Sequence, residues 1–198
     1  MITSLSQLDL NGTYTYADYL RWQLSEKVEL IKGRIFRMAP APHIITHQFL
    51  SQSIEEQFTR CLKGHSCRMV HAPADVKLAR KNPATGEEET SVVQPDIFVV
   101  CDRSKLVTGV CLGAPDLVVE ILSLGNRPVE MQEKYDLYEE NSVREYWIVE
   151  PAYRTATVYV LNNEGKYTRY GVFNDTETLT SPTLEVITVN LKEVFDNL

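Results

Sequence analysis

The chain has 198 residues, of which 43% are hydrophobic and 24% are charged, and its formal net charge is -7. This composition is typical of a globular protein and excludes a disordered tail. No apolar run approaches the roughly 20 residues of a membrane span, and residues 1–14 lack the basic start and apolar stretch of an export signal. We therefore expect a cytoplasmic protein that does not enter a membrane.

The negative charge bears on nucleic-acid binding, because proteins that coat DNA are usually basic. Two local basic clusters weaken this objection. One contains Lys27, Lys32, Arg34 and Arg37, and the other lies within residues 77–81. Such clusters bind phosphate groups in some proteins and are plain solvated surface in others. The sequence leaves both interpretations open.

The four cysteines are Cys61, Cys67, Cys101 and Cys111. The chain contains no Cys-x-x-Cys pair, which argues against a structural zinc site. Their spacing does not suggest the disulfide framework of an exported protein. We expect buried or half-buried thiols in a reducing compartment.

Periodicity predicts two helices and a hairpin in the first third of the chain. Residues 15–24 and 46–62 have apolar side chains at helical spacing. Between them, residues 27–38 are typical of two strands that turn at Gly33. The second helix would bury one apolar stripe, which consists of Phe49, Leu50, Ile54, Phe58 and Leu62.

The remainder of the chain predicts strands around one further helix. That helix is expected over residues 128–141, with Pro128 in its first turn. Strands are expected over residues 67–80, 91–100, 116–122, 145–149, 155–161 and 166–173. This order predicts a mixed α/β fold in a single domain over residues 1–198, with a core of about 26–175 and helices that flank one central sheet.

Two of the most apolar strands have an acidic residue among their aliphatic side chains, Asp96 and Glu120. A carboxylate removed from water is costly unless it is paired, hydrogen-bonded or bound to a metal. If the two strands pair antiparallel around the connection at Thr108 and Gly109, these acids lie opposite each other. Opposed residues have Cβ atoms roughly 4.5–5.5 Å apart. Two carboxylates that close repel each other, so a divalent cation is the simplest occupant of the space between them.

Pro95 precedes the first of these acids. Proline cannot donate to a strand ladder, so it marks an edge, a strand start or a bulge. A bulge would direct Asp96 toward a site. The alternative is a paired, structural Asp96 at the start of a strand.

Several segments together resemble a known family. Pro95-Asp96 followed by Glu120 on the next strand resembles the PD-(D/E)xK signature of restriction-endonuclease-like phosphodiesterases. More narrowly, about residues 13–195 look like the bacterial Uma family of restriction endonucleases. The segments that carry this resemblance are residues 28–38, His47 at a helix start, and residues 92–102, 113–123 and 130–151. The resemblance implies a central mixed sheet flanked by helices, with an additional N-terminal hairpin and C-terminal strands.

The resemblance also implies a displaced catalytic lysine. In the superfamily signature the lysine follows the acidic residue by two positions, where this chain has Leu122. The family pattern suggests that the lysine has moved to the next helix as Lys134, within Glu130-x-x-x-Lys134-x-x-x-Tyr138. The alternative for Lys134 is a surface ion pair with Glu130, worth only a few tenths of a kcal/mol.

Three further residues are candidates for the site. The resemblance implies that Glu29 is a third acidic residue, because it lies in the family's Glu-Leu-Ile-x-Gly segment; the alternative is an exposed strand carboxylate. His47 is either a neighbour of the site or part of the ordinary packing. The backbone carbonyl of Ile121 is a candidate metal ligand.

The implied function is hydrolysis of phosphodiester bonds in nucleic acid, with DNA as the expected substrate. Asp96 and Glu120, with Glu29, would hold Mg²⁺ or Mn²⁺, which activates water. Lys134 would orient that water and stabilise the phosphate oxygens. Two other interpretations stay open: a non-catalytic interaction domain that keeps the nuclease fold, and a metal-dependent hydrolase of another substrate. The oligomeric state stays open, and a homodimer is a reasonable expectation because cutting two strands needs two centres.

Overall fold

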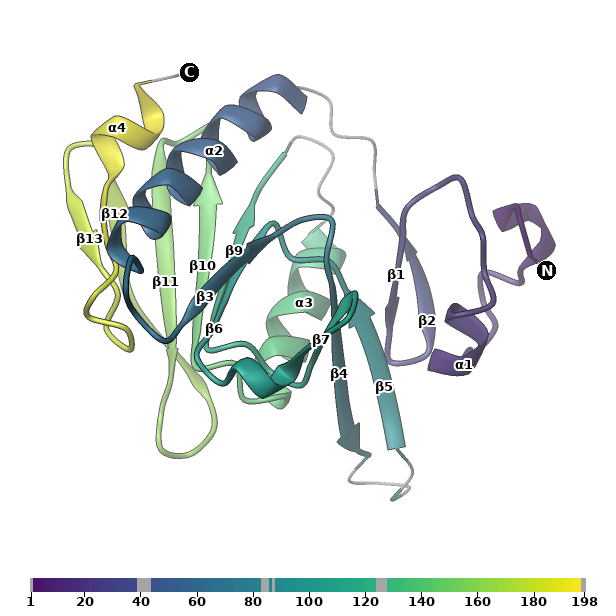
Figure 1. Cartoon of the computed structure of the whole chain (residues 1–198). Helices are drawn as coiled ribbons and strands as arrows, with labels where there is room; N and C mark the ends of the chain where they lie inside the picture. Colours follow the sequence, from purple (N-terminus) through teal and green to yellow (C-terminus); the bar gives the residue numbers. More distant parts are fainter. Residues whose placement is uncertain (1, 39–43, 83–85, 87, 124–127, 197–198) are drawn as a thin grey trace.

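The computed structural model describes residues 2–38, 44–82, 86, 88–123 and 128–196, and within these residues the strands form two six-stranded sheets and one two-stranded sheet (Figure 1). The first sheet contains, in spatial order, β2 (Arg34–Arg37), β1 (Val28–Ile31), β5 (Glu88–Val93), β4 (Asp75–Lys81), β8 (Val110–Leu112) and β7 (Leu106–Val107). The second contains β12 (Tyr167–Asn174), β11 (Thr155–Leu161), β10 (Glu145–Glu150), β9 (Leu117–Ile121), β6 (Ile97–Val100) and β3 (Arg68–His71). The small third sheet pairs β13 (Thr178–Thr180) with β14 (Thr188–Asn190).

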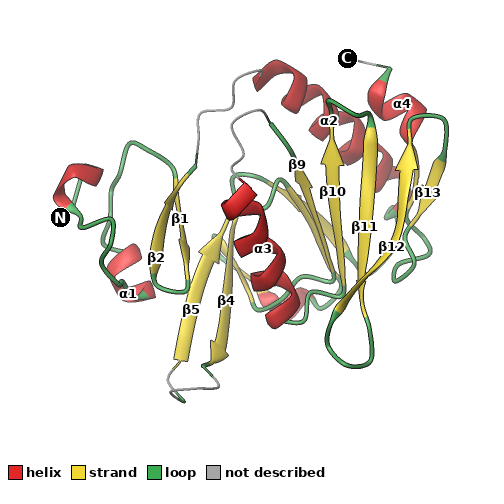
Figure 2. Ribbon diagram, turned by 180° about the vertical axis from the view of Figure 1, so that it is seen from behind, coloured by secondary structure: helices red, strands yellow, loops and turns green. Residues whose placement is uncertain are grey.

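Helices cover both faces of the second sheet. On one face lie α2 (Ile44–Cys61) and α4 (Leu191–Phe195), and on the other lies α3 (Pro128–Glu140), which packs between the two large sheets (Figure 2). The one-turn helix α1 (Tyr16–Tyr19) belongs to the N-terminal segment beside the β1–β2 hairpin. None of the helices in the described part of the chain is both long and apolar enough to cross a membrane.

The central strands of the second sheet form the core. Every residue of β6 and β9 is buried, as predicted from their dense apolar sequences. Alternate side chains face the two helix layers: Ile97 packs on the α2 side, and Phe98 and Val118 pack on the α3 side. Because strand side chains alternate, Glu120, two residues after Val118, projects toward α3.

The predicted mixed α/β class is confirmed, and the second sheet is the expected central mixed sheet flanked by helices. The other six-stranded sheet was not predicted. The single strand predicted over residues 91–100 is two strands, β5 and β6, which belong to different sheets. They are separated at residues 94–96. Pro95 accounts for the break, because it has no N–H with which to continue a ladder. The chain therefore passes from one sheet to the other immediately before Asp96.

Several element boundaries also differ from the predictions. The hairpin over residues 27–38 is confirmed, and it turns through left-handed residues at Lys32 and Gly33 (φ 51° and 77°). The helix expected over residues 15–24 is the single turn α1. In α2 the apolar stripe is buried except for Phe49, which is 48% exposed.

The register of β6 and β9 bears directly on the two acids. The strands pair antiparallel with Ile97 opposite Val119. Extending this register by one residue sets Asp96 opposite Glu120, which is the arrangement expected from the sequence. The connection between the strands turns in the β7–β8 hairpin, and this hairpin lies at the midpoint that the prediction assumed.

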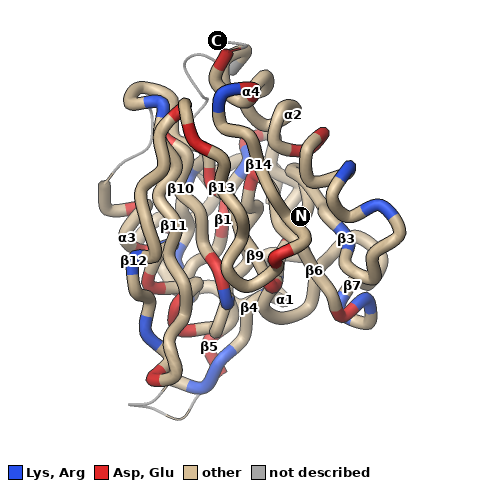
Figure 3. The backbone as a smooth tube through the Cα atoms, turned by 90° about the vertical axis from the view of Figure 1, so that its left-hand side faces the viewer, with Lys and Arg blue, Asp and Glu red and all other residues tan. Residues whose placement is uncertain are grey.

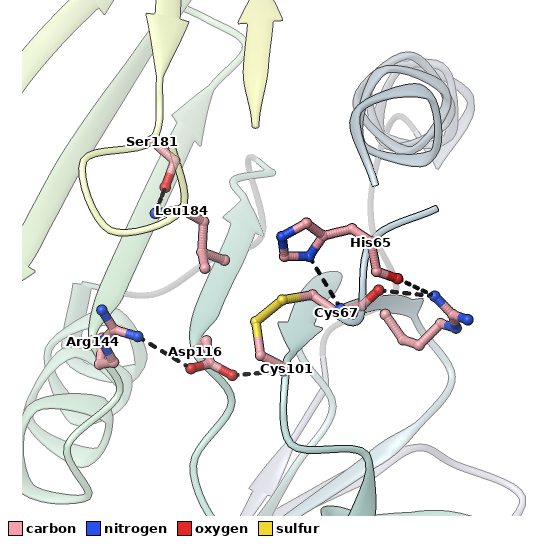
Figure 4. The surroundings of a disulfide bond; sticks show 8 residues. His65, Cys67, Cys101, Asp116, Arg144, Ser181 and Leu184 are labelled. Carbon is pink, nitrogen blue, oxygen red and sulfur yellow. Dashed lines mark hydrogen bonds and ion pairs between the residues drawn. A yellow bond between two sulfur atoms is a disulfide. The ribbon is translucent and has the colours of Figure 1, made fainter. Parts of the chain in front are cut away.

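A disulfide joins Cys67, directly before β3, to Cys101, directly after β6 (Figure 4). The expectation of four thiols was therefore wrong for this pair, whereas Cys61 and Cys111 are free. Strands β3 and β6 pair antiparallel, and the two bonded cysteines are the next opposed positions of that register. Their sequence separation of 34 residues gave no sign of this contact, because the contact depends on how the strands pair.

Candidate active site

A cleft of about 730 Å³ opens between α2, α3 and the β1–β2 hairpin. Its floor is formed by the chain entering β6 and by the end of β9. All of the residues predicted for the site line this cleft, namely Glu29, His47, Asp96, Glu120, Ile121, Glu130 and Lys134. These residues come from five segments that are distant in the sequence and that meet at one cavity.

Lys134 lies between two carboxylates. Its Nζ is 2.9 Å from Glu120 Oε1 and 3.0 Å from Glu29 Oε1. Burial lowers the pKa of Lys134, but the charges of Glu120 and Glu29 outweigh burial, so the pKa is raised above its ordinary value and the ammonium is charged. These two contacts use two of the three N–H donors of the ammonium group, so one donor is left for the cleft.

Glu120 is an almost completely buried carboxylate, 8% exposed. Tyr138 donates its hydroxyl to Glu120 Oε1 at 2.7 Å, the same oxygen that Lys134 contacts. Burial raises the pKa of Glu120 to about 7; Lys134 opposes this rise, and the nearby Asp96 and Glu29 add to it. Burial and the neighbouring Glu120 raise the pKa of Tyr138, so its phenol keeps the proton that it donates.

Asp96 is held from two sides at the end of the second sheet. Its Oδ2 accepts a hydrogen bond from the backbone N–H of Ile121 at 2.7 Å, and its Oδ1 lies 3.2 Å from His47 Nε2. The hydrogen bond to Asp96 raises the pKa of His47 against the effect of burial, and the backbone carbonyl of Ile121 also contributes. Of the two interpretations of His47, the structure therefore supports the one in which His47 lies beside the other candidate residues of the cleft.

Helix α3 brings its two functional side chains to the same place. Lys134 and Tyr138 are one turn apart, so both leave the same face of the helix. The ring of Tyr138 packs edge-on against Tyr146 of β10, with centroids 5.1 Å apart, and this contact fixes the helix against the sheet. Leu122, at the usual position of the signature lysine, lines the cleft without a charge. The contact with Glu120 is made from the helix instead.

Glu29 is not the exposed strand carboxylate that the sequence allowed as an alternative, since only 4% of it is exposed. Its Oε1 contacts Lys134 and also accepts the backbone N–H of Gln94 at 2.9 Å. Glu29 therefore helps to position the Lys134 side chain. Its role as a metal ligand stays a prediction. Gln94 was missed as a site residue. Its only signal in the sequence was its position beside Pro95.

The cleft contains oxygen atoms that could bind a divalent cation. Among the residues that the structure describes, no three His, Cys, Asp or Glu side chains form a cluster that could hold a metal ion by themselves. Mg²⁺ usually needs fewer, because it keeps several waters and one or two carboxylates. Asp96, Glu120 and the carbonyl of Ile121 are hard oxygen donors of this kind. Both hydrogen bonds to Glu120 end on Oε1, and its Oε2 accepts none from the described residues. The donor set therefore fits a dication completed by water.

Comparison with known proteins places the fold and the family. Residues 16–192 match the family Uma2, which is described as "Putative restriction endonuclease". An uncharacterized protein of Synechocystis sp. (strain PCC 6803) is 24% identical over 153 residues, which are 76% of this chain and 75% of the relative. A crystal structure from Anabaena variabilis, described as "a putative nuclease belonging to DUF820", has a TM-score of 0.69 at 18% identity and covers 91% of this chain and 96% of its own. This likeness confirms the restriction-endonuclease-like fold. Because the family match spans most of the chain, the resemblance seen in the sequence is confirmed, and the chain belongs to the Uma2 family.

Proposed function

We propose that the chain is a nuclease that hydrolyses phosphodiester bonds of DNA and depends on Mg²⁺ or Mn²⁺. The observation that carries the proposal is the Lys134 ammonium, held 2.9 Å from the buried Glu120 in the cleft that Asp96 also lines. Phosphodiester hydrolysis needs carboxylates that bind a dication and a cation that stabilises an anionic transition state. The description of the family agrees with this chemistry.

In this mechanism Asp96, Glu120 and the carbonyl of Ile121 would hold the dication. When bound, the dication supplies Lewis-acid activation of water and neutralises charge on the phosphate. Lys134 has one N–H donor beyond those used by its two carboxylates, and this donor stabilises the charge that develops on a phosphate oxygen in the cleft.

The other residues of the cleft keep these groups in place. Tyr138 and Lys134 fix Oε1 of Glu120, which leaves Oε2 for the dication. Glu29 fixes the lysine from the opposite side. His47 and the N–H of Ile121 orient the two oxygens of Asp96. Such preorganisation lowers the barrier because little rearrangement remains for the reaction itself.

Nicking of supercoiled plasmid DNA in the presence of Mg²⁺ or Mn²⁺ tests the proposal. We expect the wild-type protein to nick DNA and Lys134→Met to be roughly 100- to 1,000-fold slower, the usual cost of losing one preorganised donor. Lys166→Met changes an exposed lysine outside the cleft and is the matched control, which should keep full activity. Circular dichroism checks that both variants are folded. The proposal is wrong if the wild-type protein does not nick DNA with either metal, or if Lys134→Met is as active as the control.

A non-catalytic interaction domain is the second candidate, and one observation favours it. Lys134 contacts both Glu29 and Glu120, so these acids are compensated without a metal ion. The two candidates differ in metal binding. For a nuclease, Mn²⁺ at 100 times its Kd should stabilise the wild-type protein by about 2.7 kcal/mol, and an Asp96→Asn, Glu120→Gln double variant should not respond. An unchanged melting temperature in both proteins, together with no nicking, identifies the interaction domain.

A further inference from the structure

The four basic residues of the β1–β2 hairpin cluster have different contacts in the structure. Lys32 forms an ion pair with Glu140 at 2.8 Å. Arg34 is exposed and does not line the cleft, whereas Lys27 and Arg37 both do. Lys27 directly precedes β1, and Arg37 ends β2 opposite Val28, so the two residues lie at the same end of the hairpin.

Lys27 and Arg37 have no ion-pair partner among the residues that the structure describes. Both are exposed. Arg34, Lys77 and Lys81 also have no such partner there, but these three residues do not line the cleft. In the second basic cluster, by contrast, Arg80 contacts Glu89 at 3.1 Å and Glu140 at 3.2 Å. Within the two basic clusters, Lys27 and Arg37 are therefore the residues that both line the cleft and have no ion-pair partner in the described part of the chain.

The charge of the cleft makes these two residues informative. Of the described residues that line it, the acidic ones are Glu26, Glu29, Glu55, Asp96, Glu120 and Glu130, and the basic ones are Lys27, Arg37 and Lys134. Lys134 is already engaged by two carboxylates. Elsewhere, basic and acidic residues are interspersed along the backbone rather than separated (Figure 3). A polyanion that enters this acidic cleft needs local cations, and Lys27 and Arg37 are the two available on its wall.

We propose that Lys27 and Arg37 bind two phosphates of a polynucleotide backbone along the hairpin wall of the cleft. The identity of the ligand rests on the proposed function. The two side chains neutralise the phosphates next to the scissile bond, while the acids on the floor hold the dication. Phosphate contacts of this kind fix the position of the strand and carry no sequence information. The site therefore takes a polynucleotide, in which several phosphates are linked, in preference to a mononucleotide.

The salt dependence of DNA binding tests this assignment without any cleavage. A fluorescently labelled DNA duplex of random sequence is titrated with protein in Ca²⁺, and anisotropy gives the Kd between 50 and 200 mM salt. Each phosphate neutralised contributes about 0.9 to the slope of log Kobs against log salt. We expect the Lys27→Gln, Arg37→Gln double variant to lose about 1.8 from the slope. Over that fourfold salt range the wild-type protein should then lose about 12-fold more affinity than the variant.

The matched control is Arg34→Gln combined with Lys63→Gln. It removes the same net charge from exposed positions outside the cleft, and it should keep the wild-type slope. Lys27→Arg with Arg37→Lys keeps both charges and should also keep the slope. The assignment is overturned if the Lys27 and Arg37 glutamine variant behaves like the control, or if the wild-type protein does not bind the duplex. DNA binding is measured here without cleavage, so the two proposals can fail separately. A protein that binds DNA with the expected salt dependence but never nicks it would refute the nuclease activity and still support phosphate binding by Lys27 and Arg37.

Discussion

Replacing Lys134 by methionine should destabilise the protein strongly, because it removes the cation that compensates Glu120 and Glu29. The ammonium lies 2.9 and 3.0 Å from these carboxylates, which are 8% and 4% exposed. Removing one partner of a buried ion pair costs about 3–5 kcal/mol. For a chain of this size, each kcal/mol lowers the melting temperature by roughly 2–4 °C. We therefore expect a fall of roughly 6–20 °C when thermal unfolding is measured in EDTA.

The dependence of this loss on pH follows from Glu120. Its pKa is raised to about 7 even with the lysine present, first by burial, and without the lysine it should rise further. A carboxyl group whose pKa is higher in the folded than in the unfolded protein contributes stability at low pH, and this contribution is lost as the pH rises through the folded value. The difference in unfolding free energy between wild-type protein and Lys134→Met should therefore be smaller at pH 5 than at pH 8.

A double-mutant cycle refines the test. Lys134→Met combined with Glu120→Gln removes both charges, so the two losses should overlap and the double variant should be more stable than their sum by about 0.5–3 kcal/mol. Urea unfolding of the four proteins measures this coupling. Additive losses, together with a difference that does not change with pH, would refute the view that the lysine is what allows Glu120 to be buried.

Three further predictions concern the stability of the fold. Tyr138→Phe removes the hydroxyl that donates to Glu120. Hydrogen bonds to charged groups are worth about 1.5–3 kcal/mol, so the free energy of unfolding in urea should fall by that amount. A fall below about 0.5 kcal/mol would mean that the hydrogen bond is not formed in solution. Glu145 is fully buried and accepts hydrogen bonds from Trp147, Ser181 and Thr183. Glu145→Gln places an amide donor against these donors, so the free energy of unfolding in urea should fall by about 1–3 kcal/mol. An unchanged urea midpoint would contradict this hydrogen-bond network. Gly33 turns the hairpin at φ 77°, where an added Cβ would lie 2.8 Å from Thr13 Cγ2; Gly33→Ala should lower the melting temperature, and an increase would show that the turn relaxes without strain.

The sequence predicted the position of the two acids because their strands are joined through a hairpin. Asp96 and Glu120 are equally distant from the turn at Thr108 and Gly109, and antiparallel pairing then requires that they face each other. Pro95 was expected at an edge, a strand start or a bulge, and it does lie just before the start of β6. What the sequence did not predict is that the chain passes from one sheet to another at this point. Where a chain goes after a break depends on which surface its next residues cover, and local sequence does not encode this.

The lysine and the disulfide show the same limit. From the residues alone, Lys134 was nearly as consistent with a surface ion pair, and only the resemblance to a family favoured the cleft. The direction in which α3 packs decides between the two, and that direction comes from contacts such as Tyr138 with Tyr146. The bond between Cys67 and Cys101 likewise follows from the pairing of β3 with β6. The sequence did not predict contacts that depend on tertiary packing, except where a hairpin between two strands, as between β6 and β9, fixed their register.

Placing the lysine on a helix also changes what the site depends on. In the usual signature the acid and the lysine are two residues apart on one strand, so a single strand fixes both. Here Glu29 comes from the first sheet, Glu120 from the second, and Lys134 from the helix packed between them. The ion pairs can form only when all three layers are assembled. Substitutions that loosen the packing of α3 should therefore reduce the catalytic rate before they unfold the protein, because a displacement of about 1 Å is enough to cost roughly 100-fold in rate.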